Sequence, residues 1–163
     1  MAWAPEEFQR VFRARYPELV QFAHAFTGSR EAGEDLAQEA FVRLWSRGPV
    51  TRPKADYWLF RVVRNLALDW LKTERRRRNR EQQAHQEVDP PPFTDDDVRR
   101  IRESVSELPQ RSREVLLLRE FGNLSYNEIA KMVGRSENVV KQDLYRARER
   151  LRRMWTEKFG PEE

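Results

Sequence analysis

The chain has 163 residues, of which 36% are charged and 39% hydrophobic, and its formal net charge at pH 7 is +4. This length and composition allow one domain or two small ones, with small cores and highly charged surfaces. There is no cysteine, which excludes disulfides, thiolate metal sites and a thiol nucleophile.

Neither a membrane span nor a secretion signal is expected. No window of about 18 consecutive apolar residues occurs. The first ten residues, MAWAPEEFQR, lack a basic stretch followed by an apolar run. We therefore expect a cytoplasmic protein that does not insert into a membrane.

The charge is distributed in blocks. Residues 1–71 carry ten basic and nine acidic groups, a net charge of +1, and residues 72–80 carry six basic groups and one acidic group, a net charge of +5. Residues 81–97 carry no basic and six acidic groups, a net charge of −6. Residues 98–163 carry fifteen basic and eleven acidic groups, a net charge of +4. Such blocks indicate two basic surfaces separated by an acidic tether. Either the acidic block folds back on a basic surface when no partner is bound, or it is simply a soluble tether.

The chain begins with helical periodicity. A helix is predicted over residues 6–16, and Pro17 starts a second segment whose apolar stripe ends at Gly28. His24 lies among the apolar residues of that segment. We interpret it as a packed side chain rather than a ligand.

A third helix is predicted over residues 30–47, with Ser29 as its N-cap. Its predicted buried stripe consists of Leu36, Ala37, Ala40, Phe41, Leu44 and Trp45. Asp35, Gln38 and Glu39 share another face, which by itself would be taken as solvated. Gly33 has no local explanation, although a glycine costs a helix about 1 kcal/mol relative to alanine.

A loop over residues 48–53 precedes a long helix predicted over residues 54–72, which a run of arginines continues. Its predicted buried side consists of Leu59, Val62, Val63, Leu66 and Trp70. Another stripe alternates aromatic and basic groups: Trp58, Arg61, Asn65 and Lys72, with Arg64 beside it. This face suits an unpaired nucleic-acid strand, because a ring stacks on any base while cations hold the backbone. The alternative places Trp58 in the core.

Residues 80–94 form the predicted linker, stiffened by Pro90, Pro91 and Pro92. Extended, it could reach on the order of 45–50 Å. Thr94 is the predicted cap of a helix that Pro109 ends, and the predicted buried stripe of that helix consists of Val98, Ile101, Val105 and Leu108. A further helix over residues 113–121 closes at Gly122. No period-two pattern appears, so we expect an all-α protein with two small helical domains joined by a flexible acidic linker.

Residues 124–151 predict a helix-turn-helix. Ser125 and Glu128 have the spacing of a capping box, Gly134 can supply the positive φ of the turn, and Ser136 can cap the second helix. On the first helix the predicted inward residues are Ile129, Ala130 and Val133, and on the second they are Val140, Leu144 and Leu151.

The outward face of the second helix carries Asn138, Lys141, Gln142, Tyr145, Arg146 and Arg148. An arginine-rich helix is often just solvated, but the turn in front of it favours DNA binding. We expect Lys141, Gln142 and Arg146 to hydrogen-bond base edges, and Arg148, Arg150 and Arg152 to contact phosphates.

Together these stretches resemble a bacterial sigma factor of the extracytoplasmic-function (ECF) group, the minimal two-domain type of the sigma-70 family of RNA polymerase. The resemblance covers nearly the whole chain. It is carried by GEDLAQEAFVRLW (33–45), YWLFRVVRNLALDWLK (57–72) and LPQRSREVLLLREFGNLSYNEIAKMVG…VVKQDLYRARERLR (108–152).

The resemblance implies a division of roles. An N-terminal domain (1–79) would bind core RNA polymerase and recognise and melt the −10 element, and a C-terminal domain (95–163) would recognise the −35 element of promoter DNA as duplex. The linker (80–94) would pass near the polymerase active site and RNA-exit path. The implied partners are the clamp helices of the largest polymerase subunit, the flap, and an anti-sigma factor.

The resemblance also implies site residues. Those facing polymerase would be Asp35, Gln38, Glu39, Phe41, Leu44 and Trp45. The −10 element would be met by a loop at residues 47–56 and by Lys54, Trp58, Arg61, Arg64 and Asn65. The −35 element would be met by Ser136, Asn138, Lys141, Gln142, Tyr145, Arg146 and Arg148.

Two positions depart from the family pattern. Gly33 stands where relatives often have a larger residue. Asp143 stands where they commonly have a basic or small one. Asp143 either pairs with Arg146 or Arg150, or accepts a hydrogen bond from a cytosine amino group.

The helix-turn-helix is also compatible with two other functions. A two-domain helix-turn-helix regulator that is not a polymerase subunit would bind specific duplex DNA without polymerase. A DNA-cutting enzyme would need a nucleophile or metal constellation, for which the only histidines are His24 and His85. We therefore expect no enzyme activity, metal or cofactor.

Overall fold

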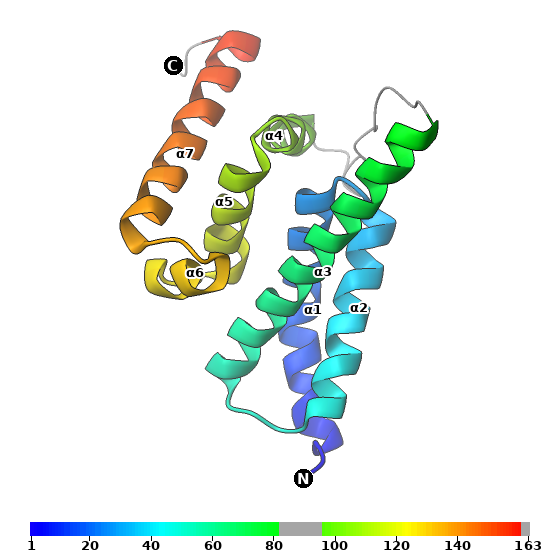
Figure 1. Cartoon of the computed structure of the whole chain (residues 1–163). Coiled ribbons are helices and arrows are strands. Elements are labelled where there is room, and N and C mark those ends of the chain that lie inside the picture. The colour runs from blue at the N-terminus through cyan, green and yellow to red at the C-terminus, as the bar shows by residue number, and fades with distance from the viewer. Residues whose placement is uncertain (82–95, 161–163) are drawn as a thin grey trace. The chain divides into compact units, whose positions relative to one another are not determined.

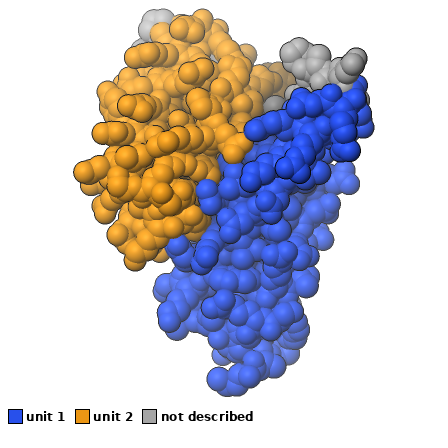
Figure 2. All heavy atoms as spheres, viewed as in Figure 1, with its two compact units in different colours: residues 1–87 blue, residues 88–163 orange. Residues whose placement is uncertain are grey.

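The computed structural model describes residues 1–81 and 96–160, and these divide between two compact units, residues 1–87 and 88–163 (Figures 1 and 2). The described residues form seven helices, and no strand occurs among them, which confirms the all-α prediction. None of these helices has the length and apolarity that a membrane span requires. Most of the predicted linker (82–94), with His85 and the predicted cap Thr94, lies outside the described residues.

The first unit is built from α1 (Pro5–Thr27), α2 (Arg30–Arg47) and α3 (Arg52–Glu81). Each helix packs against the other two. Aromatic rings fill the centre: Phe22 stacks on Phe26 with centroids 5.8 Å apart and meets Phe60 edge-on at 5.5 Å. The largest fully buried side chains of this core are Leu19, Phe22, Phe26, Leu44, Leu59, Phe60 and Val63.

α1 is one continuous helix, so the predicted break at Pro17 is wrong. Proline removes the hydrogen bond to the carbonyl of the residue four positions earlier, which is Arg13. Both Pro17 and Arg13 lie on the exposed side of α1, where water can take the place of the missing donor. Val11 and Leu19 are buried on either side of the proline, and tertiary packing of this kind outweighs local propensity.

Gly33 is explained by the contact between α1 and α2. A Cβ at this position would lie 2.9 Å from the backbone nitrogen of His24 and 3.0 Å from the carbonyl oxygen of Val20. The backbones therefore approach too closely for any side chain. His24 is 3% exposed, which confirms that it is a packed side chain.

Several details of the first unit differ from prediction. α2 has the predicted bounds and the predicted Ser29 cap, whose Oγ accepts from Ala32 N at 3.2 Å, but Trp45 is exposed rather than buried. α3 begins at Arg52, so the preceding loop is shorter than predicted. The members of the predicted buried stripes that are only half-buried are Leu36, Val62, Leu66 and Trp70.

The second unit contains α4 (Asp96–Ser106), α5 (Gln110–Gly122), α6 (Tyr126–Val133) and α7 (Glu137–Phe159). Its largest fully buried side chains are Val115, Leu118, Ile129 and Val140. Val105 and Leu108 are buried as predicted, whereas Ile101 is 48% exposed. α7 extends well beyond the helix-turn-helix, to Phe159.

Candidate nucleic-acid interface

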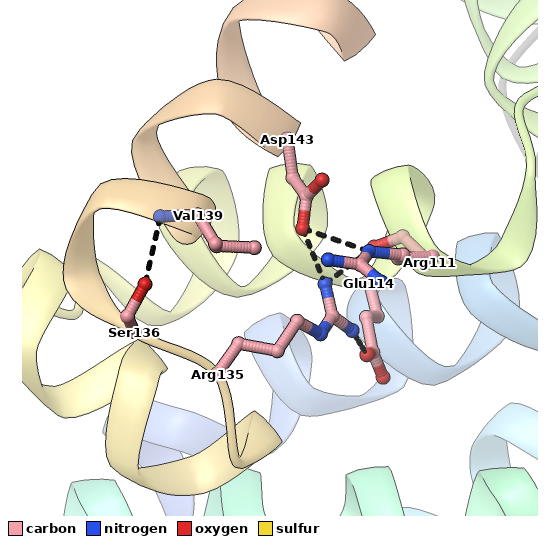
Figure 3. Close-up of polar contacts among 6 residues, drawn as sticks. All are labelled: Arg111, Glu114, Arg135, Ser136, Val139 and Asp143. Atoms are coloured by element: carbon pink, nitrogen blue, oxygen red, sulfur yellow. Dashed lines mark hydrogen bonds and ion pairs between the residues drawn. The ribbon is translucent and has the colours of Figure 1, made fainter.

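The helix-turn-helix forms from the local signals that predict it. Ser125 Oγ accepts from Glu128 N at 3.1 Å, and Glu128 Oε1 accepts from Ser125 N at 3.0 Å, which completes the capping box. Gly134 adopts φ 71°, a left-handed conformation that favours glycine. Ser136 Oγ accepts from Val139 N at 3.2 Å and so caps α7 (Figure 3). These predictions are confirmed.

The second helix of this motif, α7, presents the predicted base-facing side chains to solvent. Val140, Leu144 and Ala147 bury its opposite side. The predicted −35 residues that are exposed are Ser136, Asn138, Lys141, Gln142, Tyr145, Arg146 and Arg148. Tyr145 has 67% of its surface exposed, although it is a large aromatic residue. The geometry required of a recognition helix is present, and the contacts with DNA stay predictions.

Lys141, one of the predicted base-contacting residues, is held by neighbours. Its Nζ lies 5.5 Å from the centroid of the Tyr126 ring and 3.7 Å from Glu137 Oε1. The guanidinium carbon of Arg119 lies 4.6 Å from the same ring, and Arg119 Nη1 donates to the carbonyl oxygen of Leu124 at 2.6 Å. A chain of contacts thus runs from α5 through Tyr126 to Lys141.

Asp143 lies on the inward side of α7 and is 4% exposed. Its Oδ2 accepts from Arg135 Nη1 at 2.7 Å and from Arg111 Nε at 3.1 Å (Figure 3). Arg135 also pairs through Nη2 with Oε1 of buried Glu114. The network joins α5, the turn and α7, and it compensates the burial of two carboxylates.

The predicted roles of Asp143 are therefore wrong. It pairs with neither Arg146 nor Arg150, and a buried carboxylate already bonded to two arginines is not available to a cytosine amino group. The physical reason is that the turn and the start of α5 bring Arg135 and Arg111 to the inward side of α7. Arg111 is 32 positions away in the chain, so no local pattern could have identified it.

In the first unit, the predicted −10 residues lie along α3. Lys54, Arg61 and Asn65 are exposed, and Arg64 and Trp58 are half-buried. Arg47 of α2 makes a cation–π contact with Trp58, and its guanidinium carbon lies 5.6 Å from the ring centroid. Trp58 is therefore not a fully buried core residue.

The first turns of α3 are fixed to α1 by a bidentate ion pair. Arg15 donates from Nε to Asp56 Oδ1 at 2.8 Å and from Nη2 to Oδ2 at 2.7 Å. Hydrogen bonding to Asp56 raises the pKa of Arg15 above its usual value. No local sequence pattern predicts this pair, because 41 residues separate the two side chains.

The residues predicted to face polymerase differ in exposure. Asp35, Gln38, Glu39 and Trp45 are exposed, whereas Phe41 and Leu44 are 3% and 0% exposed. Phe41 meets Phe12 edge-on with centroids 4.9 Å apart, and the Leu44 carbonyl accepts from Trp3 Nε1 at 2.8 Å. Phe41 and Leu44 thus support this face from within and are not available for direct contact.

Exposed Trp45 lines a shallow pocket that the sequence did not predict. The pocket has a volume of about 390 Å³ and is lined on the α1 side by Pro5, Phe8 and Phe12. Phe8 packs edge-on against Trp45 with centroids 4.9 Å apart. The apolar part of the α2 face therefore extends onto α1.

The comparisons with known protein families match both units. A family model described as sigma-70 region 2 matches residues 11–77, and one described as sigma-70 region 4 matches residues 98–151. The chain is 30% identical to the RNA polymerase sigma-E factor of Streptomyces avermitilis, over 90% of this chain and 83% of that protein. It is 31% identical to the probable RNA polymerase sigma factor RfaY of Xanthomonas campestris, over 97% of this chain but only 42% of that longer protein.

Other relatives bear the name ECF RNA polymerase sigma factor. Among solved structures, the sigma factor RpoE of Bartonella quintana, crystallised with the anti-sigma factor NepR, superposes with a TM-score of 0.76. The alignment covers 93% of this chain and 98% of that chain at 21% sequence identity, which shows a shared fold.

Proposed function

The chain belongs to the sigma-70 family of RNA polymerase sigma factors, in its extracytoplasmic-function group, and we propose that its two helical units divide promoter recognition between them. A sigma factor is not an enzyme; it directs promoter-specific initiation by core RNA polymerase, which supplies the chemistry. The division of roles follows the surfaces described above.

The second unit recognises the −35 element as duplex. The observation that carries this assignment is the exposed polar stripe of α7 placed behind a fully formed turn. An α-helix fits the major groove, where lysine, glutamine and arginine side chains distinguish base pairs. Lys141, Gln142 and Arg146 are the proposed base-contacting residues.

The first unit binds polymerase and stabilises the opened −10 element. The exposed residues Asp35, Gln38, Glu39 and Trp45 form the proposed contact with the clamp helices of the largest subunit. Trp58 and the basic and amide side chains of α3 are proposed to capture unpaired bases. Stacking a base on an aromatic side chain contributes about 1–3 kcal/mol, which offsets part of the cost of opening the duplex.

Polymerase makes the two units act together. Each unit alone presents a small surface to DNA. When both units are bound to polymerase and one of them contacts the promoter, the DNA contact of the other unit becomes an intramolecular event. The effective concentration for that event reaches the millimolar range for suitable linkers, so two weak interactions give one strong one. Promoter selectivity is therefore proposed to be a property of the complex, located in the cytoplasm where transcription occurs.

The assignment of α7 is tested with Lys141→Ala and Arg146→Ala in reconstituted holoenzyme. Each substitution should cost about 1–3 kcal/mol of promoter affinity and relax the preference at one −35 position. Binding to a set of promoters with single −35 changes gives the measurement. An equal loss on every sequence would show that these residues contact phosphates and not bases.

A protein antagonist is also proposed. The B. quintana structural relative was crystallised with an anti-sigma factor. We propose that the present chain is likewise controlled by an anti-sigma protein that competes for the surfaces binding polymerase or DNA. Co-purification of the chain from its own cells, with identification of bound proteins, tests this point.

A further inference from the structure

We propose that Arg15 and Trp3 are positioning residues for the −10 element. Neither contacts DNA, but together they hold the loop over residues 48–51 and the first turns of α3 in the geometry that captures unpaired bases. This inference rests on the proposed function of the first unit. It extends that function by giving a part in promoter opening to α1 and to the segment before it.

The loop between α2 and α3 has little conformational freedom. Residues 48–51 alone connect the two helices, at the same end of the unit as the N-terminus (Figure 1). Pro49 in the loop and Pro53 just after it each have a fixed φ. Gly48 adopts φ 94°, in the left-handed region that side chains rarely enter. A loop with so few free dihedral angles cannot absorb a displacement of its ends, so contacts that fix the ends also fix the loop.

The α2 end of the loop is held by the segment before α1. Trp3 is 6% exposed, and its Nε1 donates to the carbonyl oxygen of Leu44 at 2.8 Å. The same carbonyl accepts from Gly48 N at 3.3 Å, so Trp3 is attached where the loop begins. A Cβ on Gly48 would lie 2.8 Å from the carbonyl oxygen of Met1. The backbone before α1 therefore lies directly against the loop.

The α3 end of the loop is held by α1. The guanidinium of Arg15 binds both carboxylate oxygens of Asp56, at 2.8 and 2.7 Å. The side chains of the pair are 24% and 17% exposed, so water screens it only partly. Arg15 Nη1 also donates to Glu18 at 2.6 Å, which orients the guanidinium from its own helix. Beside Asp56, Ala55 N donates to the carbonyl oxygen of Thr51 at 2.8 Å and so joins the pair to the last loop residue.

The side chains proposed to capture bases lie next to these fixed points. Lys54 and Trp58 are each two positions from Asp56 on α3. Arg47, the last residue of α2, contacts the Trp58 ring across the loop. A binding group is effective when its neighbours hold it within about 0.5 Å of the productive geometry. Release of either end of the loop should therefore reduce the capture of bases.

The test uses holoenzyme made from core polymerase and the full chain. Fluorescence anisotropy measures its affinity for a single-stranded oligonucleotide with the non-template −10 sequence of a promoter that it transcribes, and for a scrambled oligonucleotide of the same composition. A duplex with the −35 element alone reports on the second unit. Arg15→Met, Asp56→Asn and Trp3→Phe are compared with Arg13→Met, which removes the same charge from an exposed position of α1. Core polymerase affinity is measured for each variant.

Arg15→Met and Asp56→Asn should each lower affinity for the −10 oligonucleotide about fivefold or more, the lower end of what one stacked base contributes. Both should also reduce the preference over the scrambled oligonucleotide, although they remove opposite charges. Arg15→Lys should recover only part of the affinity, because an ammonium cannot bind two carboxylate oxygens as a planar fork does. Trp3→Phe keeps the ring and removes the donor, and should give a smaller loss of the same kind. Affinities for the −35 duplex and for core polymerase should not change.

Opposite effects of Arg15→Met and Asp56→Asn would overturn the inference, because they would show that the two charges act directly on DNA. An equal loss with Arg13→Met, an equal loss on the −35 duplex, or a loss of core affinity would overturn it as well. A wild-type holoenzyme that does not distinguish the −10 oligonucleotide from the scrambled one would overturn the proposed function, and the inference with it.

Discussion

Arg135, in the turn of the helix-turn-helix, and Asp143, in the recognition helix, form an ion pair of 2.7 Å between Nη1 and Oδ2. Because the carboxylate is buried, the pair fixes the direction in which α7 leaves the turn. Arg135 contacts buried Glu114 of α5 with its other terminal nitrogen. One guanidinium thus connects the recognition helix to the helix behind it.

Replacing Arg135 by methionine should be strongly destabilising. The substitution leaves two buried carboxylates without their shared cation, and breaking a buried pair in this way costs about 3–5 kcal/mol. Chemical denaturation of the full chain, monitored by near-ultraviolet signals, measures the loss. Arg111→Met is the control, because Arg111 is 57% exposed and its ion pair should contribute about 1 kcal/mol or less. Equal losses for the two variants would contradict the assigned role of Arg135.

Asp143→Asn should alter stability without altering base preference. Asparagine retains the shape and one acceptor oxygen, so the contact with Arg135 weakens but is not abolished. Since Asp143 faces α5 and the turn, the order of affinities among −35 variants should match that of the wild type. A change in preference confined to positions with cytosine would instead indicate direct contact with DNA.

Tyr126 should affect promoter binding through Lys141. A double-mutant cycle with Tyr126→Leu and Lys141→Ala measures their coupling in promoter affinity, and a cation–π contact of 5.5 Å at an exposed site predicts about 0.5–1 kcal/mol. Tyr126→Phe is the matched control, because it keeps the ring and removes only the hydroxyl. If Tyr126→Phe were as harmful as Tyr126→Leu, the hydroxyl and not the ring would be the important group.

Gly33→Ala should destabilise the first unit, although alanine is the better helix former by about 1 kcal/mol. The added methyl would meet backbone atoms of α1, which cannot rotate away as a side chain could. Overpacking of this kind typically costs about 1–3 kcal/mol. Thermal unfolding of the variant beside Glu34→Ala, an exposed neighbour, gives the comparison. A higher melting temperature for Gly33→Ala would show that α1 and α2 can move apart to accept the methyl group without a loss of stability.

Local features of the fold could be predicted because their signals lie within a few residues of one another. The Ser125–Glu128 capping box, the Gly134 turn and the Ser136 cap are examples, and the bounds of α2 were also correct. The serine caps bond through their side chains to backbone groups one turn away, and Gly134 adopts positive φ because it has no side chain, so the residue types and their spacing determine the geometry.

Features that depend on contacts between distant segments could not be predicted. The partners of Asp143 and the reason for Gly33 lie on other helices. Likewise, Phe41 fitted both a buried stripe and a polymerase-binding face, and only the packing of Phe8 and Phe12 from α1 shows that it is buried. Periodicity identifies the face of a helix but not the element that covers it.

The two units are proposed to recognise a promoter together while core polymerase holds both. Transcription in vitro with core polymerase, with and without the purified chain, tests it most directly on DNA fragments from the source genome. RNA with discrete start sites is expected only when the chain is added, and Trp58→Ala or Lys141→Ala should reduce the yield of those transcripts. Failure of the chain to associate with polymerase, or equal RNA synthesis with and without it, would show that the chain does not direct initiation.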